Sequence, residues 1–145
     1  MSSEQNKIEK VYVLDTSAVL AFREDEEGAE QVENLLRRAE AGEVEIYASF
    51  MVYMEAFYRI WQVLGKESAR ITYGELKALP IQQVDCNERV LLKAGWIKAK
   101  YRLSFADAWV IATALEKKAV LVHKDPEFEQ VQELVEMLVL PYKVQ

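Results

Sequence analysis

The stretch Val11-Tyr-Val-Leu14, followed at once by Asp15, decides the fold that this sequence predicts. Its four apolar residues include two β-branched side chains and one aromatic one, which is typical of a buried strand. A helical segment follows it, and the same succession of short strand and helix recurs along the chain. Strands that alternate with helices imply right-handed crossovers and a parallel sheet with helices on both faces. We therefore predict an α/β fold with a central parallel sheet of four or five strands.

Working outward from this strand, we predict one domain over residues 10–145, preceded by a flexible, polar lead-in at residues 1–9. The further strands are predicted at 45–48, 81–84, 119–122 and 137–140. Helices are predicted at 17–22 (capped by Ser17), 27–41 (ended by Gly42), 50–64, 67–79, from the capping box Asp85–Glu88 to about 100, 104–117 and 128–135. The segment 50–64 is apolar on nearly every side, so we expect it to be buried in the molecule or in a partner.

Composition excludes several classes of protein. The net charge of −6 argues against binding nucleic acid by bulk positive charge. One Cys and one His cannot form a zinc site of the Cys/His type, and the five glycines are too dispersed for a phosphate-binding loop. The longest stretch without charge, Ile46–Met54, is too short to span a bilayer, and the polar start shows no export signal. We expect a cytoplasmic protein without a membrane association.

Four acidic residues fall at predicted strand ends or in the first turns of the helices that follow: Asp15, Glu55, Asp107 and Asp125. Each has a local explanation, namely an Asx turn at Asp15, helix capping at Asp107 and Asp125, and an ion pair of Glu55 with Arg59. That ion pair is a weak reason to place a charge in so apolar a helix. Because parallel strands end at one edge of a sheet, we expect the four carboxylates to converge there.

Carboxylates gathered at one edge repel one another and raise each other's pKa values unless a cation lies between them. Hard divalent ions such as Mg²⁺ or Mn²⁺ prefer oxygen ligands, and such sites suit phosphodiester hydrolysis. Asp85 also follows a strand, but its capping box with Glu88 explains it, so it is left out of the site.

Four segments resemble the motifs of the PIN-domain family, especially those of its VapC-type toxins. They are Val11–Ala18 with Asp15, Ser49–Glu55 with Glu55, Leu103–Ala114 with Asp107, and Val120–Phe128 with Asp125. The resemblance covers roughly residues 11–142, and its weight comes from four motifs in order rather than from any one of them.

The resemblance implies a three-layer α/β/α sandwich and a Mg²⁺- or Mn²⁺-dependent endoribonuclease that cuts single-stranded or looped RNA. It further implies that Asp15, Asp107 and Asp125 hold the metal directly or through water. Glu55 would complete the metal site or help to deprotonate the attacking water. A homodimer is frequent in the family, and the toxin branch implies an antitoxin whose tail covers the active cleft.

One position departs from the family pattern. Two residues before the fourth acid the family usually has Thr, Ser or Asn, and this chain has His123. An imidazole could hydrogen-bond Asp125 or a phosphate, or it could weaken metal binding. Two alternatives therefore stay open: a PIN-like module that binds RNA or protein with little or no catalysis, and a housekeeping RNA-processing nuclease without an antitoxin.

A basic stretch leads into the third motif. Lys98, Lys100 and Arg102 would place positive charge near the rim of the cleft, and Lys124 adjoins Asp125. These residues are explained equally well as RNA contacts or as solvated residues that favour a helix C-terminus.

Overall fold

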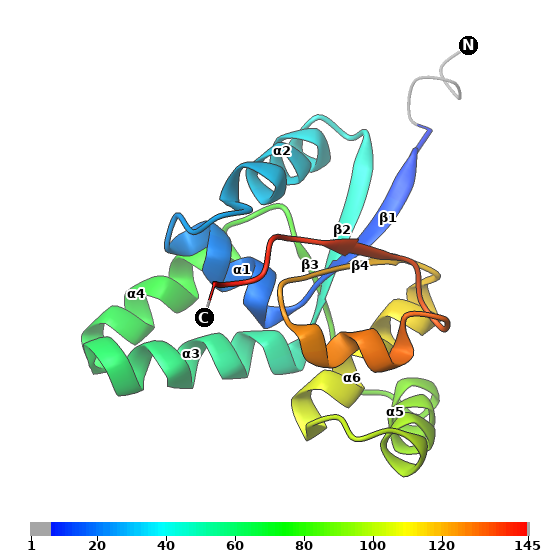
Figure 1. Cartoon of the computed structure of the whole chain (residues 1–145). Helices are drawn as coiled ribbons and strands as arrows, with labels where there is room; N and C mark the ends of the chain where they lie inside the picture. The colour runs from blue at the N-terminus through cyan, green and yellow to red at the C-terminus, as the bar shows by residue number, and fades with distance from the viewer. Residues whose placement is uncertain (1–6, 145) are drawn as a thin grey trace.

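The computed structural model describes residues 7–144 and contains one five-stranded sheet with every strand pair parallel (Figure 1). The order of the strands is β3-β2-β1-β4-β5. Their bounds are β1 Lys10–Leu14, β2 Val44–Ser49, β3 Gln82–Val84, β4 Val120–His123 and β5 Met137–Val139. The helices are α1 Thr16–Arg23, α2 Ala29–Glu40, α3 Phe50–Leu64, α4 Lys66–Lys77, α5 Glu88–Lys100 and α6 Phe105–Lys117, with a 3-10 helix, η2, at Pro126–Val131.

Helices lie on both sides of the sheet, which confirms the predicted three-layer α/β/α architecture (Figure 1). Helices α1 and α2 contact the strands from one side, and α6 contacts β1, β2 and β4 from the other. Helix α5 packs on the outside of α6, and α4 pairs with α3, so that each of these two outer helices is tied to the molecule mainly through its neighbour. The core consists of the central strands β1 and β4 and the faces of the helices against them.

The predicted starts of two helices are wrong. Helix α1 is capped by Asp15, and not by Ser17. Helix α5 begins after Asn87, whose side-chain oxygen accepts a hydrogen bond from the backbone N–H of Val90. The carboxylate of Asp85 instead accepts a hydrogen bond from Gln83, so the predicted capping box with Glu88 does not form. Asn and Asp are equally good caps, so the sequence did not distinguish the two starts.

The helix predicted at 128–135 is the 3-10 helix η2 at 126–131. Pro126 occupies its first turn behind the cap Asp125, which fixes the start earlier than the apolar pattern suggested. The turn ends early because the chain must return within a few residues to pair β5 with β4 in the sheet.

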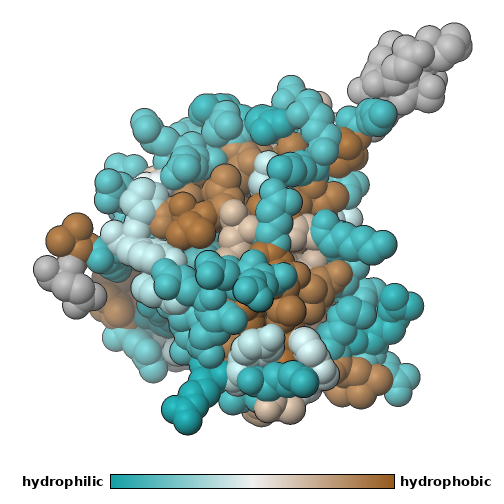
Figure 2. All heavy atoms as spheres, turned by 45° about the vertical axis from the view of Figure 1, so that its right-hand side comes forward, coloured by the Kyte–Doolittle hydropathy of each residue, from teal (hydrophilic) through white to brown (hydrophobic). Residues whose placement is uncertain are grey.

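Helix α3 has the predicted bounds, but this chain alone does not bury it on every side. One face packs in the core through residues such as Val52 and Ala56. Five of its other apolar side chains are exposed: Met54, Tyr58, Trp61, Val63 and Leu64. Helix α3 extends beyond the sheet, and α4 covers one of its sides only (Figure 1). Hydrophobic atoms also reach the surface in a band on the face shown in Figure 2.

Residues 1–6 of the predicted lead-in lie outside the described residues. Glu9 is anchored, because its backbone N–H donates to the carbonyl of Glu43 and its carboxylate binds Arg38 at 2.7 Å. No helix in the described part of the chain is long and apolar enough to cross a membrane.

Candidate metal centre

The carboxyl ends of β1 and β4 bring two of the predicted acids to the same edge of the sheet. Leu14 pairs with Val122 in the parallel register, and the backbone N–H of Asp15 donates to the carbonyl of Val122 at 3.0 Å. Asp15 thus lies beside the last residues of β4, and Asp125 stands two residues after the end of that strand.

Asp15 is held by the turn that starts α1. Its Oδ2 accepts hydrogen bonds from the backbone N–H of Ser17 at 2.9 Å and from the Ser17 hydroxyl at 2.6 Å. The same hydroxyl accepts a bond from the backbone N–H of Lys124, which joins the turns after β1 and β4. Asp15 is only 3% exposed, and its Oδ1 has no hydrogen-bond partner. A buried carboxylate oxygen without a partner is costly, and a cation would satisfy it.

The environment of Asp15 disfavours a negative charge. Burial raises the pKa of its carboxyl to about 6, although the hydrogen bonds from Ser17 act in the opposite direction. The nearby charges of Glu55 and Asp125 raise this pKa further. Hydrogen bonds place the same residues near one another, because Thr16, which follows Asp15, donates to Glu55, and Ser17 joins Asp15 to the backbone of Lys124, next to Asp125.

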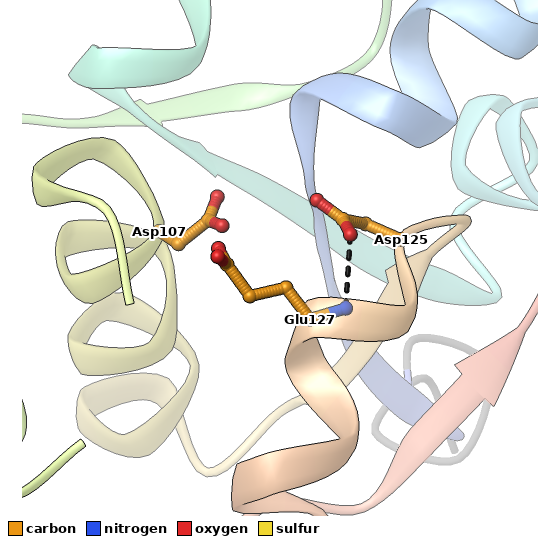
Figure 3. Close-up of side chains that lie close together, drawn as sticks. All are labelled: Asp107, Asp125 and Glu127. Atoms are coloured by element: carbon orange, nitrogen blue, oxygen red, sulfur yellow. Dashed lines mark hydrogen bonds between the residues drawn. The ribbon is translucent and has the colours of Figure 1, made fainter. Parts of the chain in front are cut away.

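Asp107 enters the same region from the first turn of α6. Ser104 caps this helix and accepts a hydrogen bond from the backbone N–H of Asp107, as the sequence predicts. Asp107, Asp125 and Glu127 each place one carboxylate oxygen in a group whose members all lie within 4.8 Å of one another. Figure 3 shows these three side chains pointing toward one another across the gap between α6 and η2. We call Asp107, Asp125 and Glu127 the acidic cluster.

The pKa of Asp107 is raised to about 9. The largest cause is burial, followed by a hydrogen bond with the Glu127 side chain and by the charges of Asp15 and Asp125. These influences all favour the protonated form of Asp107, and a cation in the acidic cluster would favour the charged form. The described residues provide no basic side chain in an ion pair with any of the three acids, so the charge has to be compensated from outside the chain.

Glu127 was missed by the sequence reasoning. It stands in the first turn of η2, where an acid is ordinarily explained by the helix dipole. The signal that could have found it is the cap at Asp125, whose Oδ1 accepts the backbone N–H of Glu127 at 2.9 Å. This bond turns the chain so that the two carboxylates face the same space (Figure 3).

Glu55 borders the acidic cluster from the second turn of α3. It is half-buried, and its Oε1 accepts a hydrogen bond of 2.7 Å from the hydroxyl of Thr16. The predicted ion pair with Arg59 is present at 3.7 Å. Neither Glu55 nor Asp15 belongs to the group of oxygens within 4.8 Å, although the charge of Glu55 acts on Asp15. The structure therefore brings all four predicted acids to one edge, and the three closest acids include Glu127.

His123 is fully buried at the end of β4 and packs against the ring of Phe128, with a centroid distance of 4.9 Å. Its Nδ1 accepts a hydrogen bond of 3.0 Å from the backbone N–H of Asp125, so in the neutral ring Nε2 carries the proton. Burial lowers the pKa of His123 and favours this neutral form. Its side chain therefore maintains the turn that carries Asp125.

Lys124 is committed to the fold. Its side chain is only 4% exposed, and its Nζ donates to the carbonyl of Glu27 at 2.6 Å and lies 3.4 Å from Glu26. This ammonium is therefore not free to bind a substrate. Lys98, Lys100 and Arg102 lie on the other side of the acidic cluster and are exposed.

Oxygen ligands alone, close together and graded from the buried Asp107 to the exposed Glu127, fit a hard divalent cation that solvent and substrate can reach. Two observations favour such an ion: the buried Oδ1 of Asp15 has no hydrogen-bond partner, and the pKa of Asp107 is raised. In both cases the described residues provide no positive charge that would neutralise the carboxylate. A cation bound there could activate a water molecule and stabilise negative charge on a phosphate.

Comparison with known proteins gives a family and a fold. The family model of the PIN domain matches residues 12–134. VapBC2 from Rickettsia felis, solved bound to a DNA fragment from its promoter, is similar with a TM-score of 0.71 and 17% identity, covering 90% of this chain and 98% of that one. VapBC-1 from nontypeable Haemophilus influenzae has a TM-score of 0.68 and 22% identity, covering 89% and 97%. VapC20 from Mycobacterium tuberculosis, described as a sarcin–ricin loop cleaving toxin, has a TM-score of 0.65 and 14% identity, covering 83% and 94%. No curated protein matches the chain.

Proposed function

Because the chain belongs to the PIN domain family, we propose that it is a divalent-metal-dependent endoribonuclease and the toxin of a VapBC-type toxin–antitoxin pair. The observation that carries the enzymatic part is the acidic cluster beside the unpartnered Oδ1 of Asp15. Carboxylates this close, without a basic partner among the described residues, are expected to be stabilised by a bound metal ion.

The proposed roles follow from the position of each side chain. Asp107, Asp125 and Glu127 would hold the ion through the oxygens that face one another, and Asp15 would contribute its free Oδ1 directly or through water. Glu55 would complete the site or accept the proton of the attacking water, held in place by the hydroxyl of Thr16.

Mg²⁺ or Mn²⁺ is the proposed ion, since all candidate ligands are carboxylate oxygens. When bound, it would lower the pKa of a water molecule and stabilise the negative charge that develops on the phosphate. The chain's own contribution is to position the acids, through the Ser17 bonds to Asp15 and the cap at Ser104 that places Asp107.

RNA is the proposed substrate because the PIN resemblance implies it, and a similar structure is described as a toxin that cleaves the sarcin–ricin loop. The alternative of a weakly catalytic binding module rested on His123. That imidazole accepts a hydrogen bond from the backbone of Asp125, which supports an intact fourth motif.

An antitoxin and a second copy of the chain are the proposed partners, and the cytoplasm is the proposed location. The similar structures include VapBC pairs, and the exposed apolar side chains of α3 would suit contact with another protein. A housekeeping nuclease without antitoxin is the competing reading. A neighbouring gene for a small DNA-binding protein would favour the toxin, and co-purification of the two products would test it.

Cleavage of a panel of labelled RNAs in Mg²⁺, Mn²⁺ or EDTA tests the enzymatic proposal. We expect cutting by the unmodified protein in Mg²⁺ or Mn²⁺, none in EDTA, and a loss of at least about 100-fold in Asp15→Asn. Asp85→Asn is the matched control, because Asp85 also follows a strand but is exposed and lies outside the acidic cluster. Activity that survives both EDTA and Asp15→Asn would remove the metal-nuclease reading.

A further inference from the structure

We propose that the last turn of α5 and the segment that joins it to α6 bind phosphate groups of the RNA, and that they do so on only one side of the bond that is cut. Lys98 and Lys100 lie in that last turn and Arg102 in the joining segment, and we call these three residues the basic arm. The inference rests on the proposed ribonuclease function, and it adds where the rest of the substrate strand lies.

The basic arm lines a shallow, open hollow of about 680 Å³ that reaches the acidic cluster at Glu127. The hollow is lined by residues 98–104 and by Glu127. A phosphodiester held at the acidic cluster would therefore have its neighbouring phosphates within this hollow. Successive phosphates of a single strand are separated by a few ångströms, so a chain leaving the cluster past Glu127 meets the basic arm first.

The position of the basic arm relative to the cluster is fixed by Gln130. Its Oε1 accepts the backbone N–H of Arg102 at 3.1 Å, and its Nε2 donates to the carbonyl of Arg102 at 3.0 Å. The same Nε2 donates to the carbonyl of Glu127 at 3.2 Å. Gln130 thus fastens the main chain of the arm to η2, the turn that carries Glu127. The bonds use only backbone atoms of Arg102 and leave its guanidinium free.

No carboxylate of the described residues neutralises the charges of the basic arm, and the one other contact of these charges is a cation–π contact of Lys100. None of its three side chains takes part in an ion pair with the acids around it, and Lys100 Nζ lies 5.7 Å from the ring centre of Trp96. The protein carries a net charge of −6, so acidic residues outnumber basic ones. An excess of basic residues in the composition therefore does not explain why three cations without an ion pair lie next to a carboxylate site. All three residues are exposed and can reach a polyanion.

A second hollow, which the site borders through Asp125 and not through Glu127, differs from the first. Three basic side chains lie in its lining, Arg59, Lys124 and Lys143. Lys124 and Lys143 both contact Glu26, and Arg59 contacts Glu55. The acids in and around this hollow neutralise its cations. A phosphate would therefore gain little there, and the strand is held mainly by the basic arm.

The binding test uses a triple variant, Lys98→Gln, Lys100→Gln and Arg102→Gln. The control triple variant, Lys66→Gln, Arg70→Gln and Lys118→Gln, removes the same charge from exposed residues on other elements. Fluorescence anisotropy with a labelled 12-nucleotide single-stranded RNA in EDTA measures binding without cleavage, between 50 and 300 mM KCl. Thermal melting of all three proteins establishes that each is folded.

We expect the arm variant to bind at least about tenfold more weakly at 100 mM KCl. Its slope of log affinity against log salt should be shallower by about 2, which corresponds to three lost contacts at about 0.7 per phosphate of a single strand. The control variant should differ from the unmodified protein by less than about twofold. Equal losses in both triple variants, or none in either, would overturn the inference.

The one-sided placement is tested in Mn²⁺ with RNAs whose cleavage site has been mapped. Uncharged methylphosphonate linkages are placed on the 5′ side or on the 3′ side of that site. We expect one of the two substitutions to slow the unmodified protein strongly and to leave the arm variant without a further loss. Equal sensitivity on both sides would contradict a single basic arm.

Failure of this inference is distinguishable from failure of the proposed function. If the unmodified protein cleaves RNA and the arm variant binds RNA equally well, the proposed nuclease function is supported and the role of the basic arm is overturned. If the unmodified protein neither binds nor cleaves any RNA, both proposals are overturned. If the arm variant keeps RNA binding but loses binding to a deca-glutamate peptide, the arm serves an acidic protein segment and the inference is overturned.

Discussion

The imidazole Nδ1 of His123 accepts a hydrogen bond from the backbone N–H of Asp125 at 3.0 Å. The PIN family usually has a short polar side chain at this position, whose oxygen can accept the same bond in an Asx- or ST-type turn. His123 is fully buried beside Phe128 and directs its ring into the core. The departure from the family pattern therefore concerns how Asp125 is positioned, rather than what binds the metal.

A set of three substitutions separates positioning from packing at His123. Asn places an acceptor oxygen close to where Nδ1 lies, whereas Leu and Gln do not. We expect His123→Asn to retain Mn²⁺ affinity within about threefold and His123→Leu to lose at least about tenfold, since an unsatisfied N–H costs about 1–3 kcal/mol. Isothermal titration with Mn²⁺ measures the affinity.

All three His123 variants are expected to melt at lower temperature, because each changes a buried ring. His123→Gln serves as the polar control with its acceptor in the wrong place. Equal losses of Mn²⁺ affinity in Asn, Gln and Leu would show that packing alone matters and would refute the positioning role.

Replacing Asp107 by Asn should stabilise the metal-free protein. At pH 8 the unfolded chain would ionise Asp107, while the fold holds its pKa near 9 and keeps it protonated. An amide avoids this penalty, and a gain of about 2 kcal/mol corresponds to a rise in Tm of roughly 6 °C for a chain of this length. Differential scanning calorimetry in EDTA measures the change.

The same Asp107→Asn variant should lose the stabilisation that metal gives. We expect MgCl₂ to raise the Tm of the unmodified protein and to leave the variant almost unchanged, because binding to the folded state alone adds stability. A variant that is less stable in EDTA, or that responds fully to Mg²⁺, would show that Asp107 is not part of the cation site.

The stability of the metal-free protein should fall as pH rises. Asp15 and Asp107 are acids whose folded pKa values, about 6 and about 9, lie above the ordinary value of 3.8. Between the ordinary value and the raised value, the folded state binds more protons than the unfolded state, so the free energy of unfolding falls as pH rises. Below about pH 4 neither acid lowers this free energy. The loss caused by Asp15 accumulates up to about pH 6, and the loss caused by Asp107 accumulates up to about pH 9.

Mg²⁺ should oppose this loss, because it competes with protons for the same oxygens. We expect the difference in Tm between MgCl₂ and EDTA to be small at pH 5 and to grow steadily to pH 8.5. Melting curves at five pH values test the trend, with Asp107→Asn as the control that should show a flatter profile. A metal effect that is independent of pH would argue against carboxylate ligands with raised pKa values.

The sequence allowed us to predict those site residues whose position follows from the end of a strand. Asp15 and Asp125 each follow an apolar run, and parallel strands bring such positions to one edge without any knowledge of side-chain geometry. Asp107 was predictable because Ser104 marks the start of its helix. The fold itself followed from the alternation of strands and helices.

The remaining features depend on turn geometry and on packing between distant segments. Asn87 and Asp85 are equally suited to cap α5, and only the bond of Asp85 with Gln83 decides between them. The apolar character of α3 did not reveal how far it extends beyond the sheet, and so its exposed face was not foreseen. The direction of the His123 ring is likewise set by Phe128, five residues later.

Glu127 offers the sharpest test of the cluster, because a nearby glutamate on the same turn provides a matched control. Glu127 faces Asp107 and Asp125, whereas Glu129 accepts a hydrogen bond from the hydroxyl of Tyr142 on the outside. Glu127→Gln removes the negative charge of Glu127 and replaces one of its two oxygens by an NH₂ group, so we expect Mn²⁺ affinity to fall by about 10- to 100-fold and cleavage to fall with it. Glu129→Gln should change either quantity by less than about twofold.

Because Glu127 also raises the pKa of Asp107, the Glu127→Gln variant should melt at a slightly higher temperature in EDTA. If Glu127→Gln binds Mn²⁺ as tightly as Glu129→Gln does, the ion must be held by Asp15, Asp107 and Asp125 alone, and the proximity of Glu127 has no role in the site.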